Sequence, residues 1–134
     1  MVKKGFAIQL EKETLENTDF RRVLYTGKHS QLVLMNLNPG EEIGKETHGH
    51  LDQFFRFESG EGEVLIDKTT HKVGDGDGII VPAGALHNVT NTSKTAKLKL
   101  YTVYSPPEHV DGTVRHTKQD ALNEPEEYDG KPTE

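Results

Sequence analysis

The sequence predicts an all-β domain, a sandwich or barrel of short antiparallel strands. Runs of alternating apolar and polar residues, which are typical of strands, follow one another along most of the chain. Turn residues separate these runs at intervals of roughly eight to twelve residues, a spacing typical of sandwiches and barrels. The length of 134 residues suits a single domain.

The expected elements follow from this alternation. In the run that ends at Asn38-Pro39-Gly40, Val33, Met35 and Leu37 share one face of a strand. One expected strand ends with residues 47–50, and the others lie in 21–27, 30–37, 53–59, 63–73 (two strands and a tight turn), 74–91 and 96–105. Helical patterns are scarce, with one short helix or loop in 10–20 and one short helix near 117–127.

Composition limits the functions that the chain can have. Apolar residues make up only 32% and charged residues 28%, so we expect an economical core with the acidic C-terminal stretch solvated or loosely packed outside it. The net charge of −6, without a basic stripe, argues against nucleic acid as a partner. Cysteine is absent, so any metal would be bound by nitrogen and oxygen ligands.

No segment of the sequence indicates secretion or a membrane. The N-terminus carries two lysines but no apolar stretch of the kind found in signal peptides. No run approaches the roughly 18 apolar residues of a membrane span. We therefore expect a cytoplasmic protein without a membrane partner.

Two histidines one residue apart, His48 and His50, indicate a metal site. Side chains alternate along a strand, so both rings would lie on one face with their Cβ atoms roughly 6–7 Å apart. A tight reversal after His50 would bring Asp52 or Gln53 alongside as a third ligand. His87 follows an apolar run and a sharp turn, which makes it a candidate for the fourth.

These residues resemble the two motifs of the cupin superfamily. The second motif has every fixed position filled, with its members at Gly76, Pro82, Gly84, His87 and Asn91.

The first cupin motif is matched less completely, at His48, His50 and Gly60. The spacer after His50 is two residues instead of three or four, Gln53 stands where the motif has Glu, and Glu42 stands where it opens with Gly. The sequence resembles small single-domain bacterial cupins of the type-2 group, some of which are described as mannose-6-phosphate isomerase-like.

The resemblance implies a double-stranded β-helix, the small jelly-roll barrel of cupins, over residues 30–105. Residues 1–29 would form an N-terminal segment that packs on the barrel or is exchanged in a dimer, and residues 106–134 a C-terminal tail. A homodimer is the implied assembly.

The resemblance also implies one divalent metal ion, held by His48, His50, Gln53 and His87, with Asp52 as the alternative ligand. Such a set suits Zn, Fe, Mn, Ni or Cu. Three imidazoles and an amide would leave the ion its full charge, whereas a Glu ligand would reduce it to +1.

Aromatic residues near the predicted ligands are expected to line a pocket for a small-molecule ligand. Phe55 and Phe57 share the strand face of Gln53, and Tyr101 lies on the last strand, where it and Tyr104 occupy opposite faces. The remaining histidines have polar, turn-like surroundings and are expected in solvent: His29, His71, His109 and His116.

The residues leave open whether the protein is an enzyme. One possibility is a metal-dependent enzyme that acts on a small polar molecule, as an isomerase or epimerase or as a dioxygenase. Isomerase chemistry needs a base, and apart from Asp52 no unassigned carboxylate is clearly placed for it. The alternatives are a non-catalytic module that binds a small ligand and a barrel in which the metal has a structural role.

Overall fold

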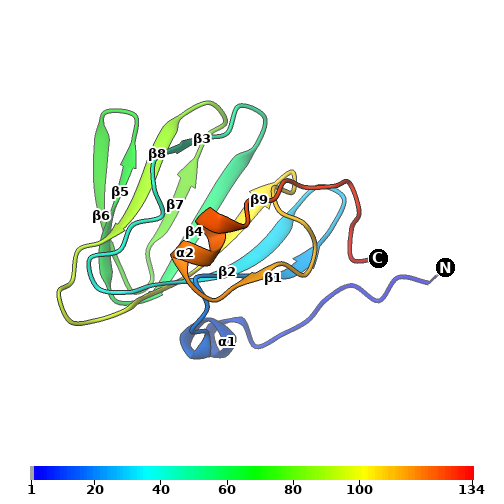
Figure 1. Cartoon of the computed structure of the whole chain (residues 1–134), viewed down its shortest axis with the longest axis horizontal. Coiled ribbons are helices and arrows are strands. Elements are labelled where there is room, and N and C mark those ends of the chain that lie inside the picture. Colours follow the sequence, from blue (N-terminus) through cyan, green and yellow to red (C-terminus); the bar gives the residue numbers. More distant parts are fainter. Residues whose placement is uncertain (1) are drawn as a thin grey trace.

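The computed structural model describes residues 2–134 and confirms the all-β class, with two antiparallel sheets enclosing one core (Figure 1). The six-stranded sheet has the order β10 (Val114–Arg115), β1 (Arg21–Thr26), β2 (Gln31–Leu37), β9 (Leu98–Ser105), β4 (Asp52–Ser59) and β7 (Gly78–Val81). The four-stranded sheet has the order β3 (Glu46–Thr47), β8 (Leu86–Asn91), β5 (Glu61–Ile66) and β6 (Thr69–Gly74). Two short helices are α1 (Leu10–Glu16) and α2 (Lys118–Asn123).

The core lies between the sheets, where the predicted alternation directs the apolar side chains. On the six-stranded sheet Met35 and Phe57 both pair in register with Leu100, and all three are fully buried. On the four-stranded sheet Val64 pairs with Val89, also fully buried. Burial of each such side chain contributes roughly 1.5–3 kcal/mol. This layer is therefore a main source of the hydrophobic stabilisation of the fold.

Two tight reversals of the chain, between β5 and β6 and between β4 and β5, need unusual backbone conformations. Strands β5 and β6 form the expected hairpin, with Asp67 at a positive φ of 49° in its turn. Gly60 joins β4 to β5 with a φ of +95°, and a Cβ added there would lie 2.4 Å from the carbonyl oxygen of Lys97. Glycine is therefore required at this position both for its backbone conformation and for the close approach of β9.

The segments outside 30–105 pack against the barrel. Strand β1 pairs with β2 on one side and β10 on the other. The backbone nitrogen of Thr133 donates to the carbonyl of Thr26 at 2.8 Å, and the two ends of the chain lie on the same side of the molecule (Figure 1). The end of the C-terminal segment is thus bound to the sheet, while most side chains of 120–134 are exposed, as expected from the sequence.

The helices have a minor part in the architecture. Helix α2 falls in the predicted region and begins with Thr117, whose side chain accepts a hydrogen bond from the backbone nitrogen of Asp120. Neither helix in the described part of the chain has the length and apolar character needed to cross a membrane.

Candidate metal centre

Three side chains that can bind a metal converge between β3 and β8. Glu46 on β3 pairs in register with His87 on β8, and His48 follows Glu46 two residues later. The nearest donor atoms of Glu46, His48 and His87 all lie within 4.8 Å of one another. One carboxylate and two imidazoles at this separation form a donor set that suits a divalent transition metal.

Glu46 and His48 also bind each other directly. Nε2 of His48 lies 3.0 Å from Oε2 of Glu46, and its Nδ1 lies 3.7 Å from Oε2 of Glu108. The hydrogen bond to Glu46 raises the pKa of His48, although burial acts in the opposite direction. Burial would raise the pKa of Glu46, but the hydrogen bond and charge of His48 outweigh it and lower that pKa. Glu46 is therefore ionised near neutral pH, and its carboxylate can accept a hydrogen bond or bind a cation.

The ring of His87 is held in one orientation. Its Nδ1 lies 3.1 Å from the carbonyl oxygen of Ala85, which can only accept, so Nδ1 carries the proton. In this tautomer of the ring, Nε2 is the nitrogen whose lone pair can bind a metal. A hydrogen bond from the far ring nitrogen to a carbonyl is the usual support of a metal-binding histidine.

Gln53 on β4 supplies a fourth candidate donor from the opposite sheet. Its side chain is buried, and Nε2 donates to Oγ1 of Thr102 at 3.0 Å. Its Oε1 is buried as well and has no hydrogen-bond partner within residues 2–134. An unpaired buried carbonyl oxygen costs roughly 1–3 kcal/mol, and a bound cation would remove this cost. The residues present therefore fit a metal ion.

The other two predicted ligands lie elsewhere. The expectation of a strand through 47–50 is wrong, because β3 ends at Thr47 and the alternation does not continue to His50. His50 is exposed and, together with Glu108 and Tyr128, lines a cavity of about 350 Å³. Asp52 is exposed, and its Oδ1 accepts a hydrogen bond from the backbone nitrogen of Ala83 at 2.9 Å.

The predicted pocket aromatics divide between the two faces of the sheet. Phe55 and Phe57 are buried in the core, and the ring of Phe55 lies 6.4 Å from that of His87. Tyr101 is half-buried and packs against Phe54, which alternates with these core residues along β4. On β9 the inward-facing tyrosine is Tyr104, whose ring lies 6.2 Å from that of His48.

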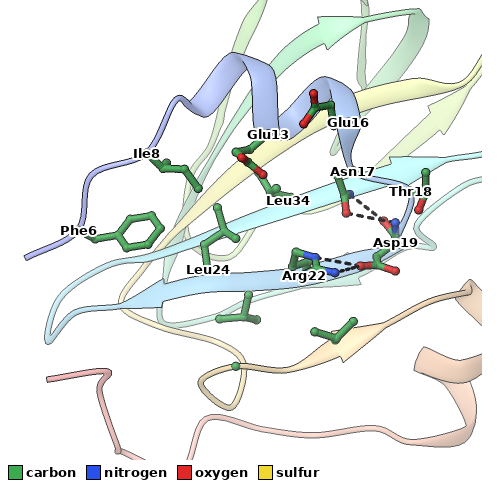
Figure 2. A pocket seen from close by; sticks show the side chains of 13 residues that line it. Phe6, Ile8, Glu13, Glu16, Asn17, Thr18, Asp19, Arg22, Leu24 and Leu34 are labelled. Carbon is green, nitrogen blue, oxygen red and sulfur yellow. Dashed lines mark hydrogen bonds and ion pairs between the residues drawn. The ribbon is translucent and has the colours of Figure 1, made fainter.

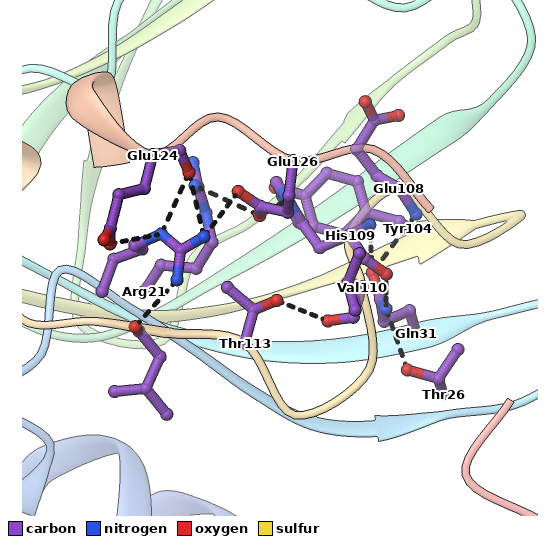
Figure 3. Close-up of polar contacts among 12 residues, drawn as sticks. Arg21, Thr26, Gln31, Tyr104, Glu108, His109, Val110, Thr113, Glu124 and Glu126 are labelled. Atoms are coloured by element: carbon purple, nitrogen blue, oxygen red, sulfur yellow. Dashed lines mark hydrogen bonds and ion pairs between the residues drawn. The ribbon is translucent and has the colours of Figure 1, made fainter. Parts of the chain in front are cut away.

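A buried polar network that the sequence did not indicate continues from Tyr104 (Figure 3). The Tyr104 hydroxyl lies 3.1 Å from Nε2 of His109, and Nδ1 of His109 lies 2.7 Å from Oε1 of Glu126. His109 is only 7% exposed, so the expectation of a solvated side chain is wrong for it. Glu126 of the C-terminal segment covers His109, and the residues next to His109 in the sequence do not indicate this contact.

Glu46, which is absent from the expected ligand set, could have been found by moving the first motif two residues toward the N-terminus. The pattern then reads Gly40, five residues, Glu46-x-His48, four residues, Gln53, six residues, Gly60. Both irregular spacings disappear in this register, and a carboxylate replaces the first histidine. Because His48 and His50 together match the His-x-His of the motif, the sequence favours the other register.

A larger cavity of about 610 Å³ lies outside the barrel, between the N-terminal segment, α1 and β1 (Figure 2). Phe6 and Ile8 line one side of it, and the ion pair between Arg22 and Asp19, at 2.8 Å, lies on another. Neither the predicted ligands nor Glu46 lines this cavity. The candidate site is therefore the group between the two sheets.

A double-stranded β-helix with histidines between its sheets defines the cupin class of barrel. The cupin domain family model matches residues 33–104, and the chain belongs to this family.

Sequence relatives and a solved structure agree with this membership. The chain is 46% identical to the uncharacterized protein YrkC of Bacillus subtilis over 125 residues, which cover 89% of this chain and 67% of YrkC. It is 43% identical to the uncharacterized protein L612 of Acanthamoeba polyphaga mimivirus over 112 residues, covering 81% and 70% of the two chains. The crystal structure of BH2720 from Bacillus halodurans is similar with a TM-score of 0.88 and 44% identity, covering 90% of this chain and 96% of that one.

Proposed function

We propose that Glu46, His48, Gln53 and His87 bind one divalent metal ion, and that the protein is a metal-dependent enzyme acting on a small polar molecule. The observation that carries the proposal is the convergence of three donor side chains within 4.8 Å. The buried, unpaired Oε1 of Gln53 supports it independently.

The donor set determines the charge of the proposed centre. Glu46 contributes one negative charge and the other three ligands are neutral, so the net charge is +1 rather than the +2 expected for His48, His50, Gln53 and His87. The bound ion would supply Lewis-acid chemistry, polarising an oxygen atom of the substrate. With a carboxylate among its ligands, the ion would be bound more tightly than by a neutral set. It would also be a weaker Lewis acid and polarise the substrate less.

The surrounding residues have supporting roles in this proposal. The carboxylate of Glu108 lies 3.7 Å from Nδ1 of His48, an ion-pair distance, and its charge favours the proton on that nitrogen and leaves Nε2 for the ion. Phe55 is buried with its ring 6.4 Å from that of His87, and it would exclude water from this side of the group. The Ala85 carbonyl accepts from Nδ1 of His87 and so assigns Nε2 to the ion.

Elemental analysis of protein purified without chelator tests the proposal. We expect close to one equivalent of a transition metal, and X-ray absorption spectroscopy should report mixed nitrogen and oxygen ligands with at least one exchangeable water. A bound ion without exchangeable water would indicate a structural metal instead of an enzyme. A protein that stays metal-free after incubation with Mn²⁺, Fe²⁺, Co²⁺ and Zn²⁺ would contradict the proposal and leave the non-catalytic binding module as the better account.

A further inference from the structure

A cavity of about 350 Å³ adjoins the metal centre through the side chain of Glu108. The residues that line this cavity come from the loop after β3, the segment after β9 and the C-terminal segment: His50, Pro106, Pro107, Glu108, Glu127 and Tyr128. Glu108 also reaches the proposed ligands, because its Oε2 lies 3.7 Å from Nδ1 of His48. The cavity and the metal centre therefore share one carboxylate.

Hydrogen bonds hold the segment that carries Glu108 in place (Figure 3). Gln31 on β2 is only 1% exposed, and its Oε1 accepts from the backbone nitrogens of Glu108 and His109 at 3.2 and 2.9 Å. Its Nε2 donates to the carbonyl oxygen of His109 at 2.7 Å. The backbone nitrogen of Tyr128 donates to the carbonyl oxygen of Glu108 at 2.9 Å and so joins two walls of the cavity. Buried groups thus fix the position of Glu108 between the cavity and the metal centre.

The charges that line the cavity favour a cation. Glu108 and Glu127 contribute two carboxylates, and no lysine or arginine within residues 2–134 lines it. Arg21 and Arg115 do not line it either, and both are paired with Glu126, at 3.8 and 3.4 Å. A phosphate or a carboxylate in the cavity would meet charge of its own sign, whereas an ammonium group would form charge-assisted hydrogen bonds.

We propose that this cavity is the substrate pocket of the metal centre and that it selects a small amine, whose ammonium group binds to Glu108 while an oxygen atom of the same molecule faces the ion. The inference rests on the proposed function and names its substrate class. One carboxylate oxygen of Glu108 faces His48, and the other is left for the substrate. The same charges disfavour a sugar phosphate, which the isomerase-like resemblance would imply. Glu108 and Tyr128 lie beyond the residues 33–104 that match the family model, so this selectivity would come from the C-terminal part of the chain.

Titration of the intact, metal-free protein with 2-aminoethanol tests recognition in the cavity. The amine is cationic near neutral pH, and NMR can follow the ring signals of His50 and Tyr128, which line the cavity. We expect saturable shifts of both rings. Ethylene glycol, which is similar in size but uncharged, should bind at least about tenfold more weakly. Shifts of both rings with inorganic phosphate but not with 2-aminoethanol would overturn the inference.

Three variants locate the binding group. Glu108→Gln should weaken binding of 2-aminoethanol by about tenfold. Glu127→Gln, at an exposed position where folding is not at risk, should weaken it by about threefold. Glu124→Gln is the matched control, because it removes the same charge from the C-terminal segment at a side chain that is 68% exposed and outside the cavity. Equal losses in all three variants would indicate an effect of net charge and overturn the inference, as would unchanged binding in Glu108→Gln.

Loading the protein with Zn²⁺ tests the connection between the cavity and the metal centre. 2-Aminoethanol should bind the Zn²⁺-loaded protein more tightly than the metal-free protein, because its hydroxyl group can bind the ion. Ethylamine lacks the hydroxyl group and should bind both forms equally. Equal affinity of 2-aminoethanol for the two forms would overturn the inference. Failure of the protein to bind Zn²⁺, with binding of the amine intact, would contradict only the proposed function.

Discussion

Glu46 and His87 face each other across β3 and β8, although they are far apart in the sequence. This pairing selects the register in which Glu46-x-His48, and not His48-x-His50, supplies two donors to the same group. The difference matters chemically because it introduces a carboxylate where the sequence suggests an imidazole.

The two registers are separated by Glu46→Ala and His50→Ala. Loss of a supporting partner already costs 10–100-fold in metal affinity, so we expect Glu46→Ala to lower Co²⁺ affinity by at least about a hundredfold. His50 is exposed outside the group, and His50→Ala should leave the affinity unchanged. Calorimetric titration of both variants, with circular dichroism to confirm folding, gives the measurement. If His50→Ala abolished binding while Glu46→Ala did not, the ligand set proposed here would be incorrect.

Asp52 is expected to affect the turn between β7 and β8 instead of the metal. Its Oδ1 accepts from the backbone nitrogen of Ala83 at 2.9 Å, and Asp52→Ala removes this bond. We expect a loss of roughly 0.5–1.5 kcal/mol in the free energy of unfolding, measured with urea, and less than a twofold change in Co²⁺ affinity. A large loss of affinity with unchanged stability would instead make Asp52 a ligand.

Gly60 should tolerate no side chain. An alanine there would combine a φ of +95° with a Cβ 2.4 Å from the carbonyl oxygen of Lys97. Backbone strain alone costs about 1–3 kcal/mol, and the contact adds to it, so Gly60→Ala should lower the free energy of unfolding by more than about 2 kcal/mol.

Gly74→Ala is the matched control for this substitution. The nearest atom to a Cβ at Gly74 is the carbonyl oxygen of Gly60 at 3.6 Å, an ordinary contact. We expect Gly74→Ala to change the free energy of unfolding, measured with urea, by no more than about 0.5 kcal/mol. Equal effects of the two substitutions would show that the approach of β9 to Gly60 is looser than described.

The free energy of unfolding should decrease on acidification because His109 and Glu126 take up protons less readily in the folded protein than in the unfolded chain. Burial lowers the pKa of His109 below its ordinary value of 6.5. Burial would raise the pKa of Glu126 above 4.5, but the hydrogen bond and charge of His109 and the charges of the neighbouring arginines lower it. The unfolded chain therefore binds more protons than the folded one below pH 6.5 at the histidine and below pH 4.5 at the carboxylate. The free energy of unfolding then decreases as the pH falls through these windows.

Urea unfolding at several pH values between about 7.5 and 5 measures this dependence. His109→Gln removes the titrating ring, so the decrease below pH 6.5 should be smaller in this variant than in the native protein. His71→Gln, at an exposed histidine in β6, is the control and should retain the native slope. Identical slopes for the native protein and His109→Gln would contradict the assigned role.

The all-β class, most of the strands, the inward-facing residues and the candidates His48, Gln53 and His87 can all be predicted from the order of residues along the chain. Period-two alternation is a local property of the chain, and the second cupin motif has fixed spacings, so neighbouring residues suffice to indicate both. Three features appear only in the folded domain: Glu46 joins the group in place of His50, Tyr104 is the tyrosine that faces inward, and His109 is buried beside Glu126. These depend on where β3 ends, on pairing between distant strands and on the path of the C-terminal segment, which are set by contacts across the whole domain and leave no signal in the local pattern of residues.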